Sequence, residues 1–313
     1  MANSKRIYTL CAVFLLLAIS SAQAQQASID DLYSQVMGDI ESGTNPVMAF
    51  RKVRKQLEEA DFSAEESQKA GLLFHYAQQP EKAIRAYETF RQAFPDKETP
   101  EIIASLVADY AATRQEGKAE ELATYFRNRF PECKDKFRYG YSRMTDQIDQ
   151  TLFSLYRRTG QYEKCVAKGK EMIETMKADA SAYFASGTLY RLLSETLVEL
   201  GRHSEAMDLL STEVNRLEPD STEAEYAELY KIAAEYEELV ETKGYKEAYK
   251  FFSSQRDKLK NKYVLRQFDA LSAHAGLAGK KMFEINVDDW LQYDEAVEHL
   301  EGKVILLDLM AST

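Results

Sequence analysis

The sequence predicts a mostly α-helical protein, a solenoid of antiparallel helix pairs with a short β segment near its C-terminus. From Ser28 to about Ala278, apolar residues recur at helical spacing with few strand-like alternations. The 313 residues include only 6 prolines and 13 glycines, which is few for an all-β protein because β turns use both. A pattern of small and aromatic residues also recurs along the chain, which indicates structural repeats.

Composition narrows the possible classes of function. The chain has 51 acidic and 40 basic residues, and the net charge of −11 argues against a general nucleic-acid binder. Hydrophobic residues at 45% and aromatic residues at 11% exclude a disordered chain. Three cysteines are too few for a disulfide framework or a cysteine-rich zinc module. A length of 313 residues suits two domains or a repeat array.

Residues 1–24 have the pattern of a cleavable signal peptide. Lys5 and Arg6 form the positive region, an apolar run covers 11–19, and small residues precede a predicted cleavage site after Ala24. A membrane anchor is the alternative, but the run is shorter than the about 20 residues that span a bilayer. A lipoprotein anchor at Cys11 conflicts with the bulky residue before it. We therefore expect export to a periplasm, with no stable membrane insertion after cleavage and a mature net charge of −13.

Three helix starts can be placed from their capping patterns. Ser63 and Glu66 have the spacing of a capping box, in which each side chain binds a free backbone amide. The segment 99–101, Thr-Pro-Glu, places a cap, a proline at the first helical position and an acid near the positive end of the helix dipole. Asp220 and Glu223 repeat the combination of cap and acid.

A repeated spacing links the helices into units. Steps of four, three and five residues separate the members of two sets: Ala83, Tyr87, Phe90 and Pro95, and Ala119, Ala123, Phe126 and Pro131. Residues four and seven positions after the small residue lie on the same helix face, and proline ends the helix. Later units keep the small residue, and two of them set a glycine five residues before it: Gly160 before Cys165, and Gly201 before Ala206. Ala248 is a weaker case.

This pattern resembles the tetratricopeptide repeat (TPR) family over roughly residues 65–260. The spacings between small residues are 36, 46, 41 and 42, against a family period of 34. Longer helices or insertions are therefore expected, and an irregular helical bundle is the alternative. The resemblance implies a scaffold that buries its core between neighbouring pairs and binds protein partners on a concave face.

No residue is assigned a catalytic, cofactor-binding or metal-binding role, and no cofactor is expected. The histidines at 75, 203, 274 and 299 have no metal-binding spacing, and phosphate-binding and hydrolase motifs are absent from the sequence. A disulfide between Cys133 and Cys165 is possible in an oxidising compartment, but we expect each to pack as a small hydrophobic residue.

Two charged or aromatic stretches have a functional and a structural interpretation. A basic stretch runs from Lys250 to Arg266, and it suits either an acidic partner or, as we expect, a solvated helical face. The segment 138–141, Arg-Tyr-Gly-Tyr, lies near an expected loop and suits a ligand contact or, as we expect, packing.

The pattern changes after Gly279. Residues 282–287 alternate as a half-buried strand does, and Val304–Met310 is an apolar run typical of a strand buried on both faces. Gly302–Thr313, GKVILLDLMAST, resembles the strand that leads into the C-x-x-C motif of thioredoxin-like proteins of the TlpA/ResA, AhpC/TSA-related group. A strand added to some other sheet is the alternative. The two motif cysteines are not present before the sequence stops at Thr313.

These observations predict three segments: a signal peptide at 1–24, a TPR-like domain at 25–278 and an incomplete thioredoxin-like domain at 279–313. The expected function is the exported, partner-binding portion of a thiol–disulfide oxidoreductase, without redox activity in the residues given. Redox chemistry of that family needs a low-pKa thiolate and a second cysteine. The alternative is a self-sufficient TPR-type periplasmic adaptor with no redox role.

Overall fold

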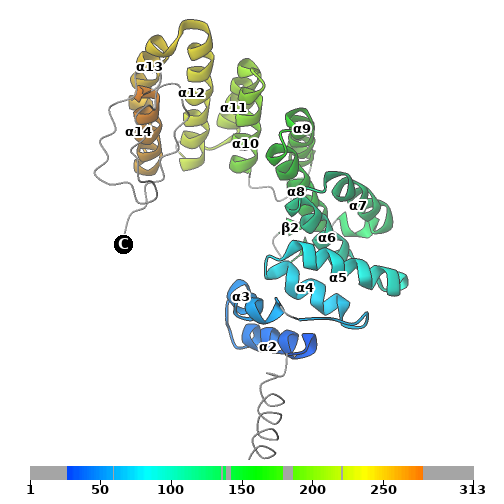
Figure 1. Cartoon of the computed structure of the whole chain (residues 1–313). Helices are drawn as coiled ribbons and strands as arrows, with labels where there is room; N and C mark the ends of the chain where they lie inside the picture. Colours follow the sequence, from blue (N-terminus) through cyan, green and yellow to red (C-terminus); the bar gives the residue numbers. More distant parts are fainter. Residues whose placement is uncertain are drawn as a thin grey trace, which may run out of the picture.

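A computed structural model describes residues 27–58, 60–134, 137–138, 142–178, 186–219 and 221–277. Within these residues the chain is almost entirely helical, and the helices follow one another along a curved path (Figure 1). The helices are α2 (Ile29–Glu41), α3 (Pro46–Leu57), α4 (Ser67–Tyr76), α5 (Pro80–Ala93), α6 (Pro100–Ala112), α7 (Glu116–Arg129), α8 (Met144–Arg158), α9 (Tyr162–Ala178), α10 (Ser186–Glu199), α11 (His203–Arg216), α12 (Thr222–Lys243), α13 (Tyr245–Ser254) and α14 (Lys262–Leu277). Three short 3-10 helices are η1 (Pro95–Lys97), η2 (Pro131–Lys134) and η3 (Arg256–Lys258).

The helices pack as six consecutive pairs, from α2 with α3 to α12 with α13, and α14 follows the last pair. The first helices of neighbouring pairs also contact one another: α6 contacts α8, and α10 contacts α12. This arrangement is the TPR-like solenoid expected from the sequence. No helix among the described residues is long and apolar enough to cross a membrane.

The fourth residue of each second helix is small and fully buried. These residues are Ala49, Ala83, Ala119, Cys165, Ala206 and Ala248, and each has 0% exposed surface. The repeat read from the sequence is therefore confirmed, and the first pair adds a unit that the sequence reading missed. A residue without a large side chain at this position lets the second helix lie close to the first.

In four of the pairs, the same kind of turn joins the first helix to the second. In the turn after α4, the residue Gln78 has a φ of 60°, and the next amide, of Gln79, donates to the Phe74 carbonyl at 2.9 Å. A donor five residues beyond its acceptor, after a left-handed residue, defines a Schellman cap. The left-handed residues of the other three turns are Arg114 (φ 59°), Gly160 (φ 72°) and Gly201 (φ 68°).

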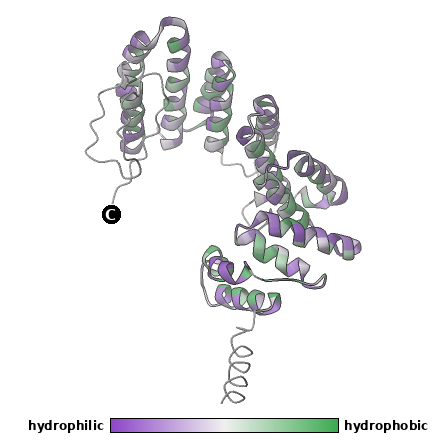
Figure 2. Cartoon of the chain, in the orientation of Figure 1, coloured by the Kyte–Doolittle hydropathy of each residue, from purple (hydrophilic) through white to green (hydrophobic). Residues whose placement is uncertain are grey.

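The core consists of two hydrophobic clusters that meet at α12. The larger cluster runs through the pairs from α2 to α11 and ends with Ala234 of α12. The smaller joins α12, α13 and α14, where the rings of Phe252 and Phe268 stack with centroids 4.6 Å apart. Most helices carry both hydrophilic and hydrophobic residues, as expected of amphipathic helices in a solenoid (Figure 2), whereas α6 is buried over most of its length.

The three expected helix caps differ in detail from the structure. Helix α6 begins at Pro100 after Thr99, as expected, but the Thr99 side chain makes no capping hydrogen bond. The reciprocal bonds of Ser63 and Glu66 form, at 3.0 and 3.3 Å between backbone nitrogens and side-chain oxygens, but α4 begins only at Ser67. The start of α12 is capped by Ser221, whose hydroxyl accepts from the Ala224 amide at 3.2 Å. A hydroxyl next to the helix start satisfies the free amide directly.

The segment around Arg138 forms a small hairpin between α7 and α8. Its strands are β1 (Phe137–Arg138) and β2 (Ser142–Arg143), paired antiparallel with Arg138 opposite Ser142. Residues 139–141 lie outside the described residues. The expected signal peptide at 1–24, the expected strands at 282–287 and 304–310, and the whole segment 279–313 also lie outside them, so the predicted domain boundaries stay predictions.

Candidate binding groove

Hollows in the surface lie along the first helices of the pairs. One of about 220 Å³ lies among α2, α4, α5 and α6, and one of about 110 Å³ lies among α8, α9 and α10. The two hollows described next are larger than either and adjoin each other where α10, α12 and α14 come together. This end of the solenoid therefore offers the most room for a ligand among these sites.

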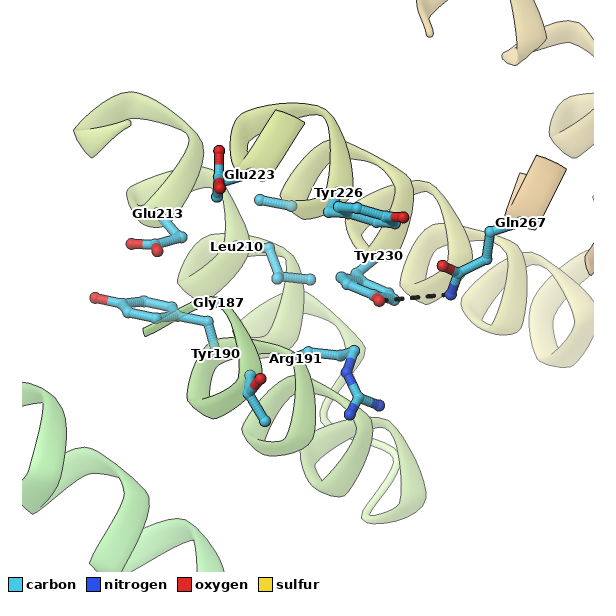
Figure 3. A pocket seen from close by; sticks show the side chains of 11 residues that line it. Gly187, Tyr190, Arg191, Leu210, Glu213, Glu223, Tyr226, Tyr230 and Gln267 are labelled. Carbon is cyan, nitrogen blue, oxygen red and sulfur yellow. Dashed lines mark hydrogen bonds between the residues drawn. The ribbon is translucent and has the colours of Figure 1, made fainter. Parts of the chain in front are cut away.

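The aromatic hollow has a volume of about 370 Å³ (Figure 3). It is lined by Gly187, Thr188, Tyr190, Arg191, Leu210, Glu213, Glu223, Tyr226, Ala227, Tyr230 and Gln267. The rings of Tyr226 and Tyr230 are stacked, with centroids 6.3 Å apart and an interplanar angle of 18°. Residues four apart on a helix lie on one face, so α12 presents both rings to the same side.

Two polar contacts hold the Tyr230 ring in place. The Gln267 amide of α14 donates to the Tyr230 hydroxyl at 3.4 Å, and the Arg191 guanidinium of α10 lies 5.8 Å from the ring centroid (Figure 3). A cation at that distance over a tyrosine face is attracted to the ring. Tyr230 thus connects three helices at the centre of the hollow.

The aromatic hollow is also lined by a buried carboxylate, Glu213, which forms an ion pair with a partly exposed arginine. Glu213 is 1% exposed, and Arg216 donates to both of its carboxylate oxygens at 2.7 and 2.8 Å. Burial raises the pKa of Tyr190, and the negative charge of Glu213 raises it further. The Tyr190 hydroxyl therefore stays protonated and can donate a hydrogen bond to a ligand.

The acidic hollow adjoins the first and has a volume of about 570 Å³. It is lined by Arg191, Ser194, Glu195, Val198, Glu199, His203, Tyr230, Ala233, Ala234, Glu237, Glu241, Gln267 and Leu271. Arg191, Tyr230 and Gln267 line both hollows, so the two share a wall, and together they are called here the terminal groove. Its direction runs across α10, α12 and α14.

Glu195 is the one acid of this hollow that accepts hydrogen bonds from arginines of the described residues. Arg191 donates to one of its oxygens at 2.7 Å, and Arg157 donates to the other at 2.6 Å. Its charge is therefore balanced within the chain.

The remaining three acids of the hollow face one another around a buried histidine. The pKa of Glu237 is raised, first by loss of water around its carboxylate and then by the charges of Glu241 and Glu199, although His203 opposes the shift. The residue Glu237 as a whole is exposed at the mouth of the hollow, so its carboxylate remains reachable. His203 is only 6% exposed, and its Nε2 lies 3.1 Å from Oε2 of Glu241.

The histidines that the sequence left without a role fall into separate places. His75 Nδ1 lies 2.8 Å from Oδ1 of the buried Asp109, between α4 and α6, while His203 lines the acidic hollow. The side chain of His274 and all of His299 lie outside the described residues. No group of three or more histidine, cysteine, aspartate or glutamate side chains in the described part of the chain is arranged to hold a metal ion.

The two cysteines of the repeat region are fully buried reduced thiols, as the expectation of small hydrophobic packing requires. Cys165 Sγ lies 3.7 Å from Oγ1 of Thr196 on the neighbouring α10, and burial raises the pKa of its thiol. A protonated, enclosed thiol is a poor nucleophile.

One residue of the basic stretch forms an ion pair in the structure, because Arg256 donates to both oxygens of Asp269 at 3.0 and 3.2 Å. The backbone amide of Lys260 donates to Glu225 at 2.9 Å, a contact that leaves the charge of the lysine side chain unchanged. The choice between a solvated helical surface and an acidic partner stays a prediction. The terminal groove was not found from the sequence, although the spacing of Tyr226 and Tyr230 gave a signal for a shared face.

Comparisons with known proteins add solved structures of similar fold only. No protein-family model matches the chain. No curated protein matches it. MamA MSR-1 C2 is 17% identical, over 68% of this chain and 99% of that chain, with a TM-score of 0.40. A tetratricopeptide repeat protein from Parabacteroides merdae is 15% identical, over 83% and 90%, with a TM-score of 0.38. Yeast Tom70 is 12% identical, over 86% and 59%, with a TM-score of 0.40.

Proposed function

We propose that this protein is a binding scaffold whose terminal groove receives a segment of a partner protein. The observation that carries the proposal is that the two hollows adjoin across three helices, since Arg191, Tyr230 and Gln267 line both of them. A groove that crosses three helices suits an extended segment better than a small compact ligand. Helical-repeat scaffolds bind partners along such surfaces, built by the stacking of their repeats.

The lining of the groove has the chemistry of a protein-binding surface. Tyrosine is enriched at interfaces because its ring supplies contact area at a low cost in conformational entropy and its hydroxyl forms hydrogen bonds. Tyr190, Tyr226 and Tyr230 all line the aromatic hollow. The net charge of −11 disfavours nucleic acid as the partner.

A selection from a displayed random-peptide library tests this function without assuming a partner. We expect enriched peptides to bind the purified chain and to lose at least about tenfold in affinity when Tyr230→Ala removes the ring between the hollows. Tyr263→Ala is the matched control, because Tyr263 on α14 is 62% exposed and lines neither hollow. Enriched peptides that respond equally to both variants would show that the groove is not the binding surface.

The finer assignment, a periplasmic protein joined to a thioredoxin-like domain, remains a proposal supported by sequence patterns alone. The signal-peptide pattern ending at Ala24 supports export, and Gly302–Thr313 supports the thioredoxin-like continuation. The mass of the mature protein tests the first, because cleavage after Ala24 predicts Gln25 as its first residue. The gene sequence beyond the codon for Thr313 tests the second: a C-x-x-C motif there supports the oxidoreductase, and its absence supports the adaptor.

A further inference from the structure

We infer that the acidic hollow of the terminal groove binds the guanidinium group of an arginine side chain on the partner segment. This inference rests on the proposed function, and it names the chemistry that one end of the groove recognises. Three observations support it: carboxylates of the hollow without a lysine or arginine partner, a buried histidine that also lines the hollow, and an apolar surface beside them.

The first observation is an excess of acceptors. Among the described residues, no lysine or arginine lies within ion-pair distance of Glu199, Glu237 or Glu241, whereas Glu195 in the same hollow has two arginines. Loss of water around the carboxylate raises the pKa of Glu237 most, and the charges of Glu241 and Glu199 raise it further against the opposing effect of His203. A cation placed among them would relieve this repulsion.

The second observation is the state of His203 below these acids. Its side chain is more than nine-tenths buried and lines the hollow, yet neither ring nitrogen has a hydrogen-bond partner among the described residues. The 3.1 Å approach of Nε2 to Glu241 is an ion-pair distance without hydrogen-bond geometry. A buried polar group without a partner is costly, so a hydrogen-bonding group that enters the hollow would satisfy a ring nitrogen of His203.

The wall of the hollow selects the kind of cation. Val198, Ala233, Ala234 and Leu271 provide an apolar surface along which the methylene stem of a long basic side chain can pack. The described residues offer no cluster arranged for a metal ion, which leaves an organic cation. A guanidinium has five donors in a planar fork and can serve several acceptors at once, which an ammonium group does less well.

Two peptides that differ in one group test the inference. The probe is a fluorescein-labelled Gly-Ala-Leu-Ala-Arg-Ala-Leu-Ala-Gly peptide, and its control carries citrulline, a neutral isostere, in place of the arginine. Fluorescence anisotropy with the full chain should give a Kd at least about tenfold lower for the arginine peptide, since hydrogen bonds to charged groups are the strong ones. The difference in Kd between the two peptides should decrease as the salt concentration is raised, because salt screens the charges of the carboxylates. Equal affinities would overturn the inference.

Substitutions of single glutamates test which carboxylates bind the arginine peptide. Glu237→Gln and Glu241→Gln should each weaken binding of the arginine peptide by about three- to tenfold and leave the citrulline peptide unchanged. Glu235→Gln is the matched control, because it removes the same charge from α12 at a residue that does not line the hollow. An equal loss with Glu235→Gln would reduce the effect to net charge and overturn the assignment. Circular dichroism of each variant confirms that the helices are intact.

Two further outcomes separate this inference from the function on which it rests. Library-selected peptides that need Tyr230 but do not distinguish arginine from citrulline would overturn the inference and leave the proposed function standing. Tighter peptide binding after Lys280→Ala and Lys281→Ala would identify the chain's own tail as the occupant, and would overturn the assignment to a partner.

Discussion

Arg114 and Gly160 occupy the same position in two turns of the solenoid, with φ angles of 59° and 72°. Each lies five residues before a fully buried small residue, Ala119 in one case and Cys165 in the other. The amide that follows each closes the same cap, from Gln115 to Tyr110 and from Gln161 to Tyr156, at 2.8 Å in both. The turn is therefore fixed by the geometry of the helix pair and not by the presence of glycine.

Because the two residues are equivalent, substitutions at them should change the free energy of unfolding by different amounts. Gly160→Ala introduces a Cβ at a left-handed position and should lower the free energy of unfolding by about 1 kcal/mol. Arg114→Gly removes the same strain but adds backbone freedom to the unfolded chain, so it should change the free energy of unfolding by less than about 0.5 kcal/mol. Urea unfolding followed by circular dichroism measures both, and an equal loss in the two variants would contradict the shared geometry.

A second pair of glycines separates close packing from helix propensity. A Cβ added at Gly71 of α4 would lie 2.5 Å from ring carbons of Tyr87 on α5, whereas one added at Gly38 of α2 would meet nothing within 4 Å. Gly71→Ala should therefore lower the free energy of unfolding by about 1–3 kcal/mol through overpacking. Gly38→Ala should raise it by about 0.5–1 kcal/mol, because alanine favours the helix. Thermal unfolding of the two variants checks the opposite signs.

The sequence identified the helix pairs whose residues follow the common spacing, and it did not identify the pair that departs from that spacing. Ala49 lies 34 residues before Ala83 and is just as buried, but the position seven residues after it is Gln56 instead of an aromatic residue. The first pair was therefore missed. Likewise, glycine revealed the turns at 160 and 201, whereas Gln78 and Arg114 adopt the same φ without that sequence signal.

The terminal groove was beyond the sequence for a different reason. The spacing of Tyr226 and Tyr230 shows that they share a face of one helix, but the groove also needs Arg191 from α10 and Gln267 from α14. Which residues of three helices meet depends on how the pairs stack, and local periodicity carries no information on that stacking. Similarly, nothing local shows that the acids Glu199 and Glu237 face each other across two helices.

The two buried thiols give a prediction for the redox state of the repeat region. Cys133 and Cys165 are reduced and fully buried, so a thiol reagent should label neither in the native protein and both after denaturation without reductant. Cys165→Ala is the control, because alanine occupies the same position in the other pairs and should cost less than about 1 kcal/mol. That variant should lose one labelled thiol, assigned by peptide mass. A failure to label either cysteine after denaturation would show a disulfide between them.

The buried carboxyl of Asp109 predicts a pH dependence of stability with a definite sign. Its side chain is 5% exposed; Oδ1 lies 2.8 Å from Nδ1 of His75, and Oδ2 has no hydrogen-bond partner among the described residues. Burial raises the pKa of Asp109 above 3.8, although the hydrogen bond and the charge of His75 oppose the shift. The folded state therefore holds this proton more tightly than the unfolded state does. The stabilisation is complete below the unfolded pKa and is lost as the pH rises through the folded pKa.

Replacing this carboxyl by an amide should remove that loss. Asp109→Asn keeps an oxygen that can accept from His75, so the free energy of unfolding of the variant relative to the wild type should rise between about pH 4 and about pH 7. Asp269→Asn is the control, because Arg256 lowers the pKa of that exposed carboxyl, so its contribution is already largely present at about pH 4 and the difference from the wild type should stay nearly constant up to about pH 7. Urea unfolding of the three proteins at both pH values measures the trend. A difference between the Asp109→Asn variant and the wild type that stays constant with pH would show that ionisation of Asp109 does not affect stability.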